Sequence, residues 1–576
     1  MILKLVFSCH LLLIVVSSAW ASDPIVRSPA GTFLGSTLTA MNGQVYNAFR
    51  GIPFAKPPLR DLRFQPPIPL DHIDGLYDAT DFKPHCIQLN IIPNSFSLGQ
   101  EDCLYLNVFT PRCSDRNDGH LKKVFVFFHG GGNYNGFTHV YLPGTLVTEQ
   151  DIVVVTVAYR VGYLALLSTM TPSCEGNLHL KDQLLALAWV QENILDFGGD
   201  PAEVTIGGES AGGFDTGYLT LLPGSRDLFA RAYCQSGVPG TKNTLMMTNP
   251  RPEAIKLARR LGCLREEQPD PVADSEFEKL VDCLKQVPAE QFAVNGTADI
   301  PNLQTILSDD LFPKNIEELF SDENYLKSIN FFERNYLVGV NENEGDLFSI
   351  INKQTVSALP EEASRSLTPE VMYYKTIEMF LAPVFGPVSQ QVIQKVAEYY
   401  ESNTPLSPLG GFCGDALFNI AAVQYVTAAA AGRSSLDSHV YFFRFVHSPE
   451  YILESYKGLL HGNDLLYLFD LDIDILLKIL PLKVDVNKWN KNDDLLKQKF
   501  TRLVGDFINT GNPGKSLASE LPSGWPGFDK KQQQYLEFGL KSEVKQRFIS
   551  DRVQLWSEQI PKWIRDYPLT RINDEL

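Results

Sequence analysis

The sequence predicts an α/β fold in which helices cover a large, mostly parallel sheet. Two continuous apolar runs, residues 124–128 and 152–157, are typical of strands that are buried on both faces. Residues 178–197 instead have helical periodicity and end at two glycines. Strands that alternate with helices favour a parallel sheet. Further strands are expected at 204–206, 336–340 and 440–445, and a last helix at 551–563.

Length and composition are those of a globular protein. The chain has 576 residues, of which 44% are hydrophobic and 20% are charged, close to ordinary globular values. The net charge of −18 disfavours binding to nucleic acid or to an anionic membrane surface. Because no clear linker divides the chain, we expect residues 22–576 to form a single domain.

The first 21 residues resemble a secretory signal peptide. Lys4 gives this segment a positive end, residues 5–16 are mostly apolar, and Ala19-Trp20-Ala21 offers small residues at the cleavage positions. The alternative is an uncleaved anchor, but the apolar run is short for a bilayer span of ~20 residues. No later stretch is long and apolar enough, so no transmembrane anchor is expected.

The last four residues, 573–576, suggest an address for the protein. Asn573-Asp574-Glu575-Leu576 differs at one position from the K-D-E-L and H-D-E-L retrieval signals. Together with the signal peptide, this tail predicts a protein of the endoplasmic reticulum lumen whose partner is a retrieval receptor; secretion is the alternative. Entry into that compartment also makes Asn295, in the sequon Asn295-Gly296-Thr297, a candidate for glycosylation.

The strongest chemical motif is Gly208-Glu209-Ser210-Ala211-Gly212, a G-x-S-x-G sequence directly after a predicted strand. A serine hydroxyl is a weak nucleophile until a base takes its proton. A sharp strand-to-helix turn would lift Ser210 out of the sheet, and small flanking residues permit such a crowded turn. The alternative is a glycine-rich loop with an incidental serine, which the preceding strand and the helix-compatible sequence that follows disfavour.

A second motif, His129-Gly130-Gly131-Gly132, follows the strand at 124–128. Backbone N–H groups in such a turn stabilise the negative charge that develops on a carbonyl oxygen during acyl transfer, by about 3–4 kcal/mol each. A flexible glycine turn is the alternative, but H-G-G-G upstream of G-x-S-x-G is the combination expected of lipases and esterases. Ala211 would add an N–H group from the start of the helix.

The general base and its acidic partner stay open on sequence pattern alone. The fold that these motifs indicate has the chain order serine, acid, histidine. His439 precedes a strand and is interpreted as structural, whereas His447 follows that strand and His461 lies in a loop, so these last two remain alternatives. The candidate acids all follow the strand at 336–340: Glu342, Glu344 and Asp346.

These segments resemble the type-B carboxylesterase family, which includes cholinesterases and liver-type carboxylesterases. The resemblance covers nearly the whole mature chain, and one of its signatures matches residues 101–108, Glu-Asp-Cys-Leu-Tyr-Leu-Asn-Val. Other matching segments are 49–55, 197–213, 235–237, 341–345, 461–462 and 511–513. The resemblance implies an α/β-hydrolase fold and hydrolysis of small carboxylic esters through an acyl-serine, without a metal or organic cofactor.

Carried over residue by residue, the resemblance makes Ser210 the nucleophile, Glu344 the acid and His461 the base. The oxyanion donors become Gly131, Gly132 and Ala211. Two other functions remain as alternatives: a lipase-like esterase, and a cell-adhesion or binding protein of the kind that some relatives with this fold represent. Those relatives usually lose the serine and carry a membrane anchor, whereas this chain keeps every catalytic position.

The resemblance also implies two disulfides, Cys86–Cys103 and Cys263–Cys283. The remaining cysteines of the mature chain have no counterpart in it: Cys113, Cys174, Cys234 and Cys413. One departure concerns the substrate. Cholinesterases carry a tryptophan in the loop closed by the first disulfide, where it holds a quaternary ammonium group, but residues 87–102 contain none. Acetylcholine is therefore not expected to be the preferred substrate.

Overall fold

The computed structural model of the chain describes most of the residues that follow the predicted signal peptide. The described ranges are 23–89, 99–112, 120–240, 246–293, 303–307, 310–350, 368–404, 407–433, 439–451, 460–471 and 485–569. Residues 1–21, Cys113, Asn295 and the tail 573–576 lie outside these ranges. The assignments of a signal peptide, a glycosylation site and a retrieval signal therefore stay predictions.

Within the described residues, a mixed sheet of 11 strands forms the centre of the molecule, in the order β16-β15-β14-β13-β10-β9-β7-β8-β6-β4-β3. The block from β8 to β15 is parallel throughout, and the remaining strands pair antiparallel at its two sides. The strands are β3 (Ser36–Thr39), β4 (Val45–Pro53), β6 (Tyr105–Pro111), β7 (Lys122–Phe128), β8 (Val153–Val157), β9 (Gly199–Glu209), β10 (Arg231–Gln235), β13 (Asn335–Asn341), β14 (Val440–Phe445), β15 (Gln534–Phe538) and β16 (Glu543–Gln546).

The two apolar runs form the middle of this sheet because both of their faces are covered. Every residue of β8 is buried. Along β7, side chains alternate between two cores: Val124 and Val126 pack in the first, and Phe125 and Phe127 in the second. The first core is completed by α3 (Leu178–Asn193), α4 (Ala211–Leu219) and α14 (Ile420–Ala431), and the second by α1 (Gly144–Gln150) and α17 (Lys491–Thr510).

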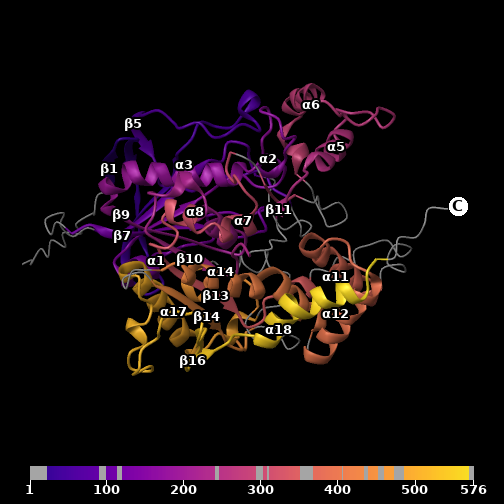
Figure 1. Cartoon of the computed structure of the whole chain (residues 1–576). Coiled ribbons are helices and arrows are strands. Elements are labelled where there is room, and N and C mark those ends of the chain that lie inside the picture. Colours follow the sequence, from indigo (N-terminus) through magenta and orange to yellow (C-terminus); the bar gives the residue numbers. More distant parts are fainter. Residues whose placement is uncertain are drawn as a thin grey trace, which may run out of the picture.

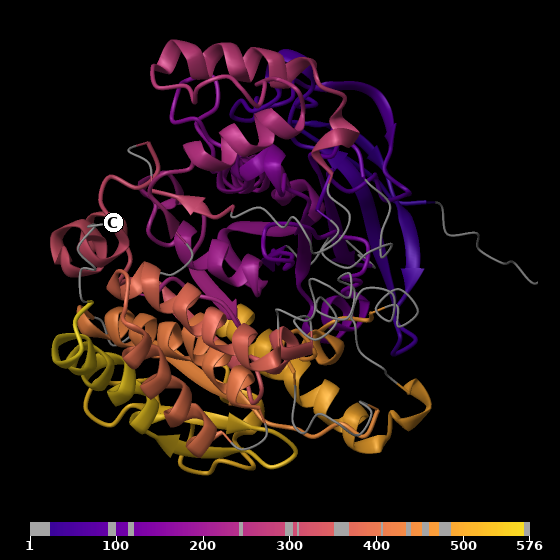
Figure 2. The same cartoon turned by 90° about the vertical axis from the view of Figure 1, so that its right-hand side faces the viewer.

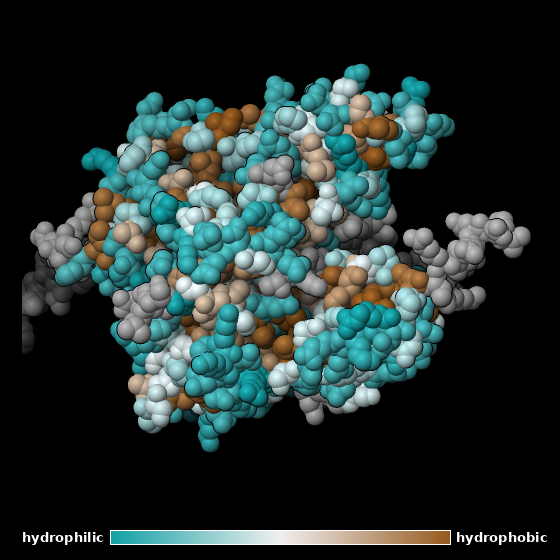
Figure 3. All heavy atoms as spheres, in the orientation of Figure 1, coloured by the Kyte–Doolittle hydropathy of each residue, from teal (hydrophilic) through white to brown (hydrophobic). Residues whose placement is uncertain are grey.

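The first part of the chain and its C-terminal part occupy largely different halves of the molecule. In Figures 1 and 2 the first part of the chain, coloured indigo to magenta, lies above the orange and yellow C-terminal part, and α5 and α6 extend at the top. The face shown in Figure 3 is mostly hydrophilic, with separate hydrophobic patches. The remaining elements are β1 (Ile25–Ser28), β2 (Gly31–Leu34), β5 (Ile73–Asp78), α2 (Tyr163–Leu166), β11 (Met246–Met247), α5 (Arg251–Arg260), α6 (Asp274–Gln286), β12 (Thr305–Ile306), α7 (Ile316–Ser321), α8 (Glu323–Ser328), α11 (Pro369–Phe385), α12 (Gln390–Asn403), α13 (Pro408–Gly414), α15 (Leu465–Leu468), α18 (Ser550–Gln554) and α19 (Ile560–Asp566).

The predicted elements are present, with three main differences in extent. The helix expected at 178–197 is α-helical to Asn193 and continues as a 3₁₀ turn, Ile194–Phe197. The strand expected at 204–206 begins earlier, at Gly199, because its first residue already pairs with Lys122 of β7. The helix expected at 551–563 consists of α18 and α19 with a π-helical turn, Leu555–Gln559, between them. Among the described residues, no single helix is long and apolar enough to cross a membrane, although α12 and the segment Pro408–Ala431 pass that test together as a pair bent by 108°.

The disulfides that the resemblance implies are both present, and join Cys86 to Cys103 and Cys263 to Cys283. Cys174, Cys234 and Cys413 are free thiols in the interior. Burial raises the pKa of Cys174 to about 12 and that of Cys413 to about 12 as well. Because the thiolate is the reactive form, these side chains act as small apolar core residues. Cys113 is outside the described ranges, so its pairing stays open.

Candidate active site

Ser210 lies in a sharp turn between β9 and α4, as its motif predicts. Its backbone has a φ of 56° and a ψ of −122°, a conformation that non-glycine residues rarely adopt. A side chain on Gly208 would overlap the backbone of Gly212, and one on Gly212 would overlap the carbonyl oxygen of Phe128. The turn therefore requires both glycines. Its neighbours in the chain are buried, but Ser210 keeps partial exposure.

Ser210, His461 and Glu344 form one hydrogen-bonded chain. Oγ of Ser210 lies 2.8 Å from Nε2 of His461, and Nδ1 of His461 lies 2.6 Å from Oε2 of Glu344. This is the arrangement of a nucleophile, a base and an acid that orients the base. The structure thus brings the three predicted residues together, although they come from distant parts of the chain.

The carboxylate of Glu344 is fixed by two further donors. The hydroxyl of Ser236 donates to its Oε1 over 2.7 Å, and the backbone N–H of Asn341 donates to the same oxygen over 2.5 Å. Ser236 follows β10 and has a φ of 51°, so its position is also defined by an unusual turn. Sequence reasoning matched residues 235–237 to the family but gave Ser236 no role; that match was the available signal.

The other two candidate acids have different partners. The carboxylate of Glu342 lies 3.5 Å from the guanidinium of Arg444. Asp346 accepts a hydrogen bond of 2.6 Å from Asn343. Of the three candidates, only Glu344 contacts a histidine beside Ser210, so it alone is placed to orient that histidine.

The rival histidines also lie elsewhere. Nε2 of His447 is 3.0 Å from Oδ1 of Asp493, which also accepts a hydrogen bond from Tyr467. His439 precedes β14, whereas Ser210 and Glu344 follow the strands before them, so His439 lies at the opposite edge of the sheet. Neither histidine has a serine hydroxyl among its hydrogen-bond partners in the described part of the chain.

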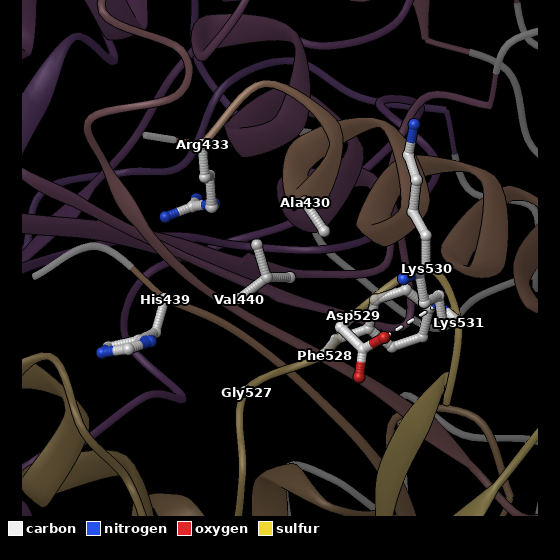
Figure 4. Close-up of a pocket in the computed structure, with 9 residues that line it drawn as sticks. All are labelled: Ala430, Arg433, His439, Val440, Gly527, Phe528, Asp529, Lys530 and Lys531. Carbon is white, nitrogen blue, oxygen red and sulfur yellow. Dashed lines mark hydrogen bonds between the residues drawn. The ribbon is translucent and has the colours of Figure 1, made fainter. Parts of the chain in front are cut away.

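His439 lines a separate surface pocket of about 430 Å³ (Figure 4). Figure 4 shows the side chains of His439 and Lys530 pointing in different directions, so these basic groups do not converge on one point. None of the predicted catalytic residues is part of this pocket. The residues that line it are Ala430, Arg433, His439, Val440, Gly527, Phe528, Asp529, Lys530 and Lys531.

The H-G-G-G segment packs directly against the serine turn. A Cβ atom on Gly130 would lie 3.2 Å from the Cβ atom of Ser210. Gly131 and Gly132 have φ values of 117° and 65°, in the region that favours glycine. Ala211 is the first residue of α4, and the first N–H groups of a helix have no partner within it. The loop that carries two of the predicted oxyanion residues and the helix that carries the third therefore both border on Ser210.

Glu209 is a buried carboxyl group that sequence reasoning did not single out. Its Oε1 lies 3.4 Å from Nε2 of His461, and burial raises the pKa of Glu209 to about 8. Burial lowers the pKa of His461, but the nearby Glu209 and Glu344 outweigh this effect and raise it to about 9. His461 therefore holds a proton more strongly than an ordinary histidine. The variable position before the serine in the motif was the signal for Glu209.

Aromatic rings cover the imidazole of His461. The ring of Phe418 stacks on it, with 4.5 Å between the ring centroids, and that of Phe348 lies 6.2 Å away. Phe418 belongs to a π-helical turn, Asp415–Asn419. One face of the imidazole is thus covered by an apolar ring. Among the described residues, no group of three or more His, Cys, Asp or Glu side chains is placed to hold a metal ion.

Comparison with known proteins identifies the family of the chain. The model of the carboxylesterase family matches residues 22–556. Acetylcholinesterase-1 of Trittame loki is 30% identical, over 92% of this chain and 93% of its own length. Carboxylesterase 1C of Rattus norvegicus is 31% identical over 94% of each chain. The cocaine esterase of Homo sapiens is 30% identical, over 97% of this chain and 96% of its own length.

The large mixed sheet with helices on both faces and the family match together define an α/β-hydrolase fold. The chain belongs to the carboxylesterase family, and its class is that of a carboxylic ester hydrolase. The predicted fold class, family and enzyme class are confirmed.

Proposed function

We propose that this chain hydrolyses carboxylic esters through a covalent acyl intermediate on Ser210. The observation that carries the proposal is the hydrogen-bonded chain from Ser210 through His461 to Glu344. Each neighbouring pair is within 2.8 Å, the range in which a base can take a hydroxyl proton directly. The roles of the three residues follow from their order along these hydrogen bonds.

In the first half of the reaction, Oγ of Ser210 attacks the carbonyl carbon of the ester while Nε2 of His461 takes the hydroxyl proton. Glu344 accepts from Nδ1 of His461, so it orients the ring and stabilises the imidazolium that forms. The C–O bond to the alcohol then breaks, and His461 returns its proton to the leaving oxygen. The acyl group stays on Ser210.

In the second half, water replaces the alcohol. His461 takes a proton from a water molecule, whose oxygen attacks the acyl carbon, and the bond to Ser210 breaks as the hydroxyl recovers its proton. Both halves place negative charge on the former carbonyl oxygen. The N–H groups of Gly131, Gly132 and Ala211 are the proposed donors to it, which stabilises the tetrahedral intermediates by about 3–4 kcal/mol per donor.

We further propose neutral esters, rather than choline esters, as the preferred substrates. Residues 87–102 have no tryptophan that would bind a quaternary ammonium group. Sequence identity does not separate the two classes, because the relatives named acetylcholinesterase and carboxylesterase match to similar extents.

A fluorophosphonate probe tests the nucleophile. It should label Ser210 covalently, and a peptide adduct located by mass spectrometry would identify the residue. Ser210→Ala should lose labelling and about 10⁶-fold in turnover of p-nitrophenyl acetate, while the exposed-serine control Ser557→Ala keeps both. Labelling of a different serine, or turnover in a folded Ser210→Ala protein close to that of the wild type, would contradict the proposal. Acetylthiocholine in the same assay should be the poorer substrate.

A further inference from the structure

The proposed oxyanion donors belong to two separate elements, so their relative position must be held by contacts between those elements. Gly131 and Gly132 follow β7, whereas Ala211 begins α4. In the loop, Gly131, Gly132 and the next residue, Asn133, all have positive φ values, of 117°, 65° and 58°. Glycine restrains such a turn little, and asparagine is one of the few other residues that adopt this conformation readily. The loop therefore depends on outside contacts for its position.

Asn133 connects this loop to α4 through its side chain. Its Nδ2 donates a hydrogen bond of 2.9 Å to Oδ1 of Asp215, and Asn133 is 8% exposed. The backbone carbonyl of Asn133 accepts from the N–H of Gly162 over 2.7 Å. The hydroxyl of Tyr159 donates to the carbonyl of His129 over 2.5 Å and lies 3.3 Å from Oδ1 of Asn133. Both ends of the glycine turn are thus tied down.

Asp215 is completely buried and is held in turn by α3. Gln183 donates a hydrogen bond of 2.7 Å to its Oδ2, and Nε2 of His179 lies 3.6 Å from its Oδ1. Burial raises the pKa of Asp215 to about 7, against the two amide donors. A buried carboxyl group costs free energy that an apolar side chain of similar volume avoids. Packing alone therefore does not explain why a carboxyl group, that of Asp215, lies opposite Asn133.

We propose that the hydrogen bond between Asn133 and Asp215 fixes the spacing of the two halves of the oxyanion hole, which makes both side chains positioning residues for ester hydrolysis. The inference rests on the proposed function, since it takes Gly131, Gly132 and Ala211 as the donors. Negative charge develops on the substrate oxygen only after attack. A loosened hole therefore weakens binding of the transition state and leaves binding of the ester nearly unchanged.

Two substitutions break this hydrogen bond from opposite ends. Asn133→Gly removes the amide but keeps the positive φ without strain, and Asp215→Leu removes the acceptor. In both, kcat should fall by about 10- to 100-fold with KM almost unchanged. The inhibition constant of a trifluoromethyl ketone, which mimics the tetrahedral oxyanion, should rise by the same factor as kcat falls. Asp215→Asn keeps an oxygen acceptor for Asn133 and should retain most of kcat.

A matched control separates positioning from stability. Thr305→Val removes the 3.3 Å contact between the Thr305 hydroxyl and His179 in the same buried cluster, so it should lower the melting temperature without changing kcat. An equal loss of kcat in Thr305→Val would overturn the proposal. So would a folded Asn133→Gly or Asp215→Leu protein with the kcat and inhibition constant of the wild type. If only one of these two variants folds, the kcat and inhibition constant of that variant decide whether the proposal holds.

Fluorophosphonate labelling of the wild-type chain distinguishes failure of the positioning role from failure of the proposed function. A chain that hydrolyses esters without a label on Ser210 contradicts the proposed function itself. A chain that is labelled on Ser210, and whose Asn133→Gly variant is unchanged in kcat and in affinity for the ketone, contradicts only the positioning role.

Discussion

The imidazole of His461 stands between a hydroxyl and a carboxylate, whereas that of His447 is bonded to the buried Asp493. His461→Ala should therefore lower kcat/KM by about 10⁴- to 10⁶-fold, because the variant has no group to take the Ser210 proton. His447→Ala should cost stability, through loss of the hydrogen bond to the buried Asp493, and leave turnover within a few fold. Assays of the two purified variants with p-nitrophenyl acetate decide which histidine is the base. A folded His447→Ala protein without activity would reverse the assignment.

The pH dependence of the reaction should reflect the acids around His461. Because Glu209 and Glu344 outweigh burial and raise the pKa of His461 to about 9, and because the base must be neutral to take a proton, activity should rise with pH through a midpoint above 6.5. Glu209→Gln removes one of these negative charges, so the acid limb of kcat/KM should move to lower pH. Profiles of the two proteins between pH 5 and 10 measure this.

The control for that experiment is the exposed acid Glu558 on the last helical segment. Glu558→Gln should leave the profile of the wild type unchanged, since the Glu558 side chain is exposed, accepts a hydrogen bond from Gln554 and is not among the groups that shift the pKa of His461. An acid limb that stays in place in Glu209→Gln would mean that Glu209 keeps its own proton throughout the limb, as its burial favours, and that Glu344 alone raises the pKa of His461.

At the scale of elements, the contact between α4 and the end of β7 leaves no space for a side chain. A Cβ atom on Gly212 would overlap the carbonyl oxygens of Phe128 and His129. Gly212→Ala should therefore lower the free energy of unfolding by about 1–3 kcal/mol and reduce kcat, because α4 carries Ala211 and must shift. At Gly224 an added Cβ meets nothing within 4 Å, so Gly224→Ala should change neither. Thermal melting and turnover of both variants check this, and a fully active, stable Gly212→Ala protein would refute it.

The elements nearest the nucleophile could be predicted because their signals are local. The apolar runs of β7 and β8 and the G-x-S-x-G turn each depend on a few consecutive residues, and the structure places them as expected. The start of β9 was placed too late because Asp200 and Pro201 are unusual in a strand; pairing of Gly199 with Lys122 extends it. Local pattern carries no information about that partner.

The choice of base and acid could not be made from pattern, because it depends on contacts between distant parts of the chain. His447 directly follows β14 and looks equally suitable, yet the sheet places it beside Asp493. Glu342 and Glu344 are two residues apart after the same strand, but one meets Arg444 and the other His461. The family resemblance supplied these assignments. It supplied nothing for Asn133 and Asp215, whose contact appears only in the folded structure.

At the scale of the whole molecule, the end of the chain reaches back to the candidate active site. Arg552 of α18 forms an ion pair of 3.0 Å with Asp415, which is completely buried. Asp415 begins the π-helical turn that carries Phe418, the ring stacked on His461. The hydroxyl of Tyr400 and the amide of Asn419 donate to the same carboxylate. The C-terminal helices therefore support the wall of the site through one charged contact.

Breaking that contact should destabilise the protein in a way that depends on pH. Arg552→Met keeps the length of the side chain but leaves the Asp415 carboxylate buried without its cation, which costs about 3–5 kcal/mol. Burial already raises the pKa of Asp415, and Arg552 opposes this rise, so the variant should hold a proton on Asp415 to a still higher pH. A carboxyl group with a higher pKa in the folded than in the unfolded state makes the protein less stable as pH rises above the pKa of the unfolded state, about 4. The deficit of Arg552→Met in urea unfolding should therefore be larger at pH 8 than at pH 5. As a control, Lys562→Met breaks an exposed ion pair with Asp566 and should show no measurable loss of stability at either pH. If Arg552→Met instead loses the same free energy of unfolding at pH 5 and at pH 8, Asp415 stays ionised without its partner.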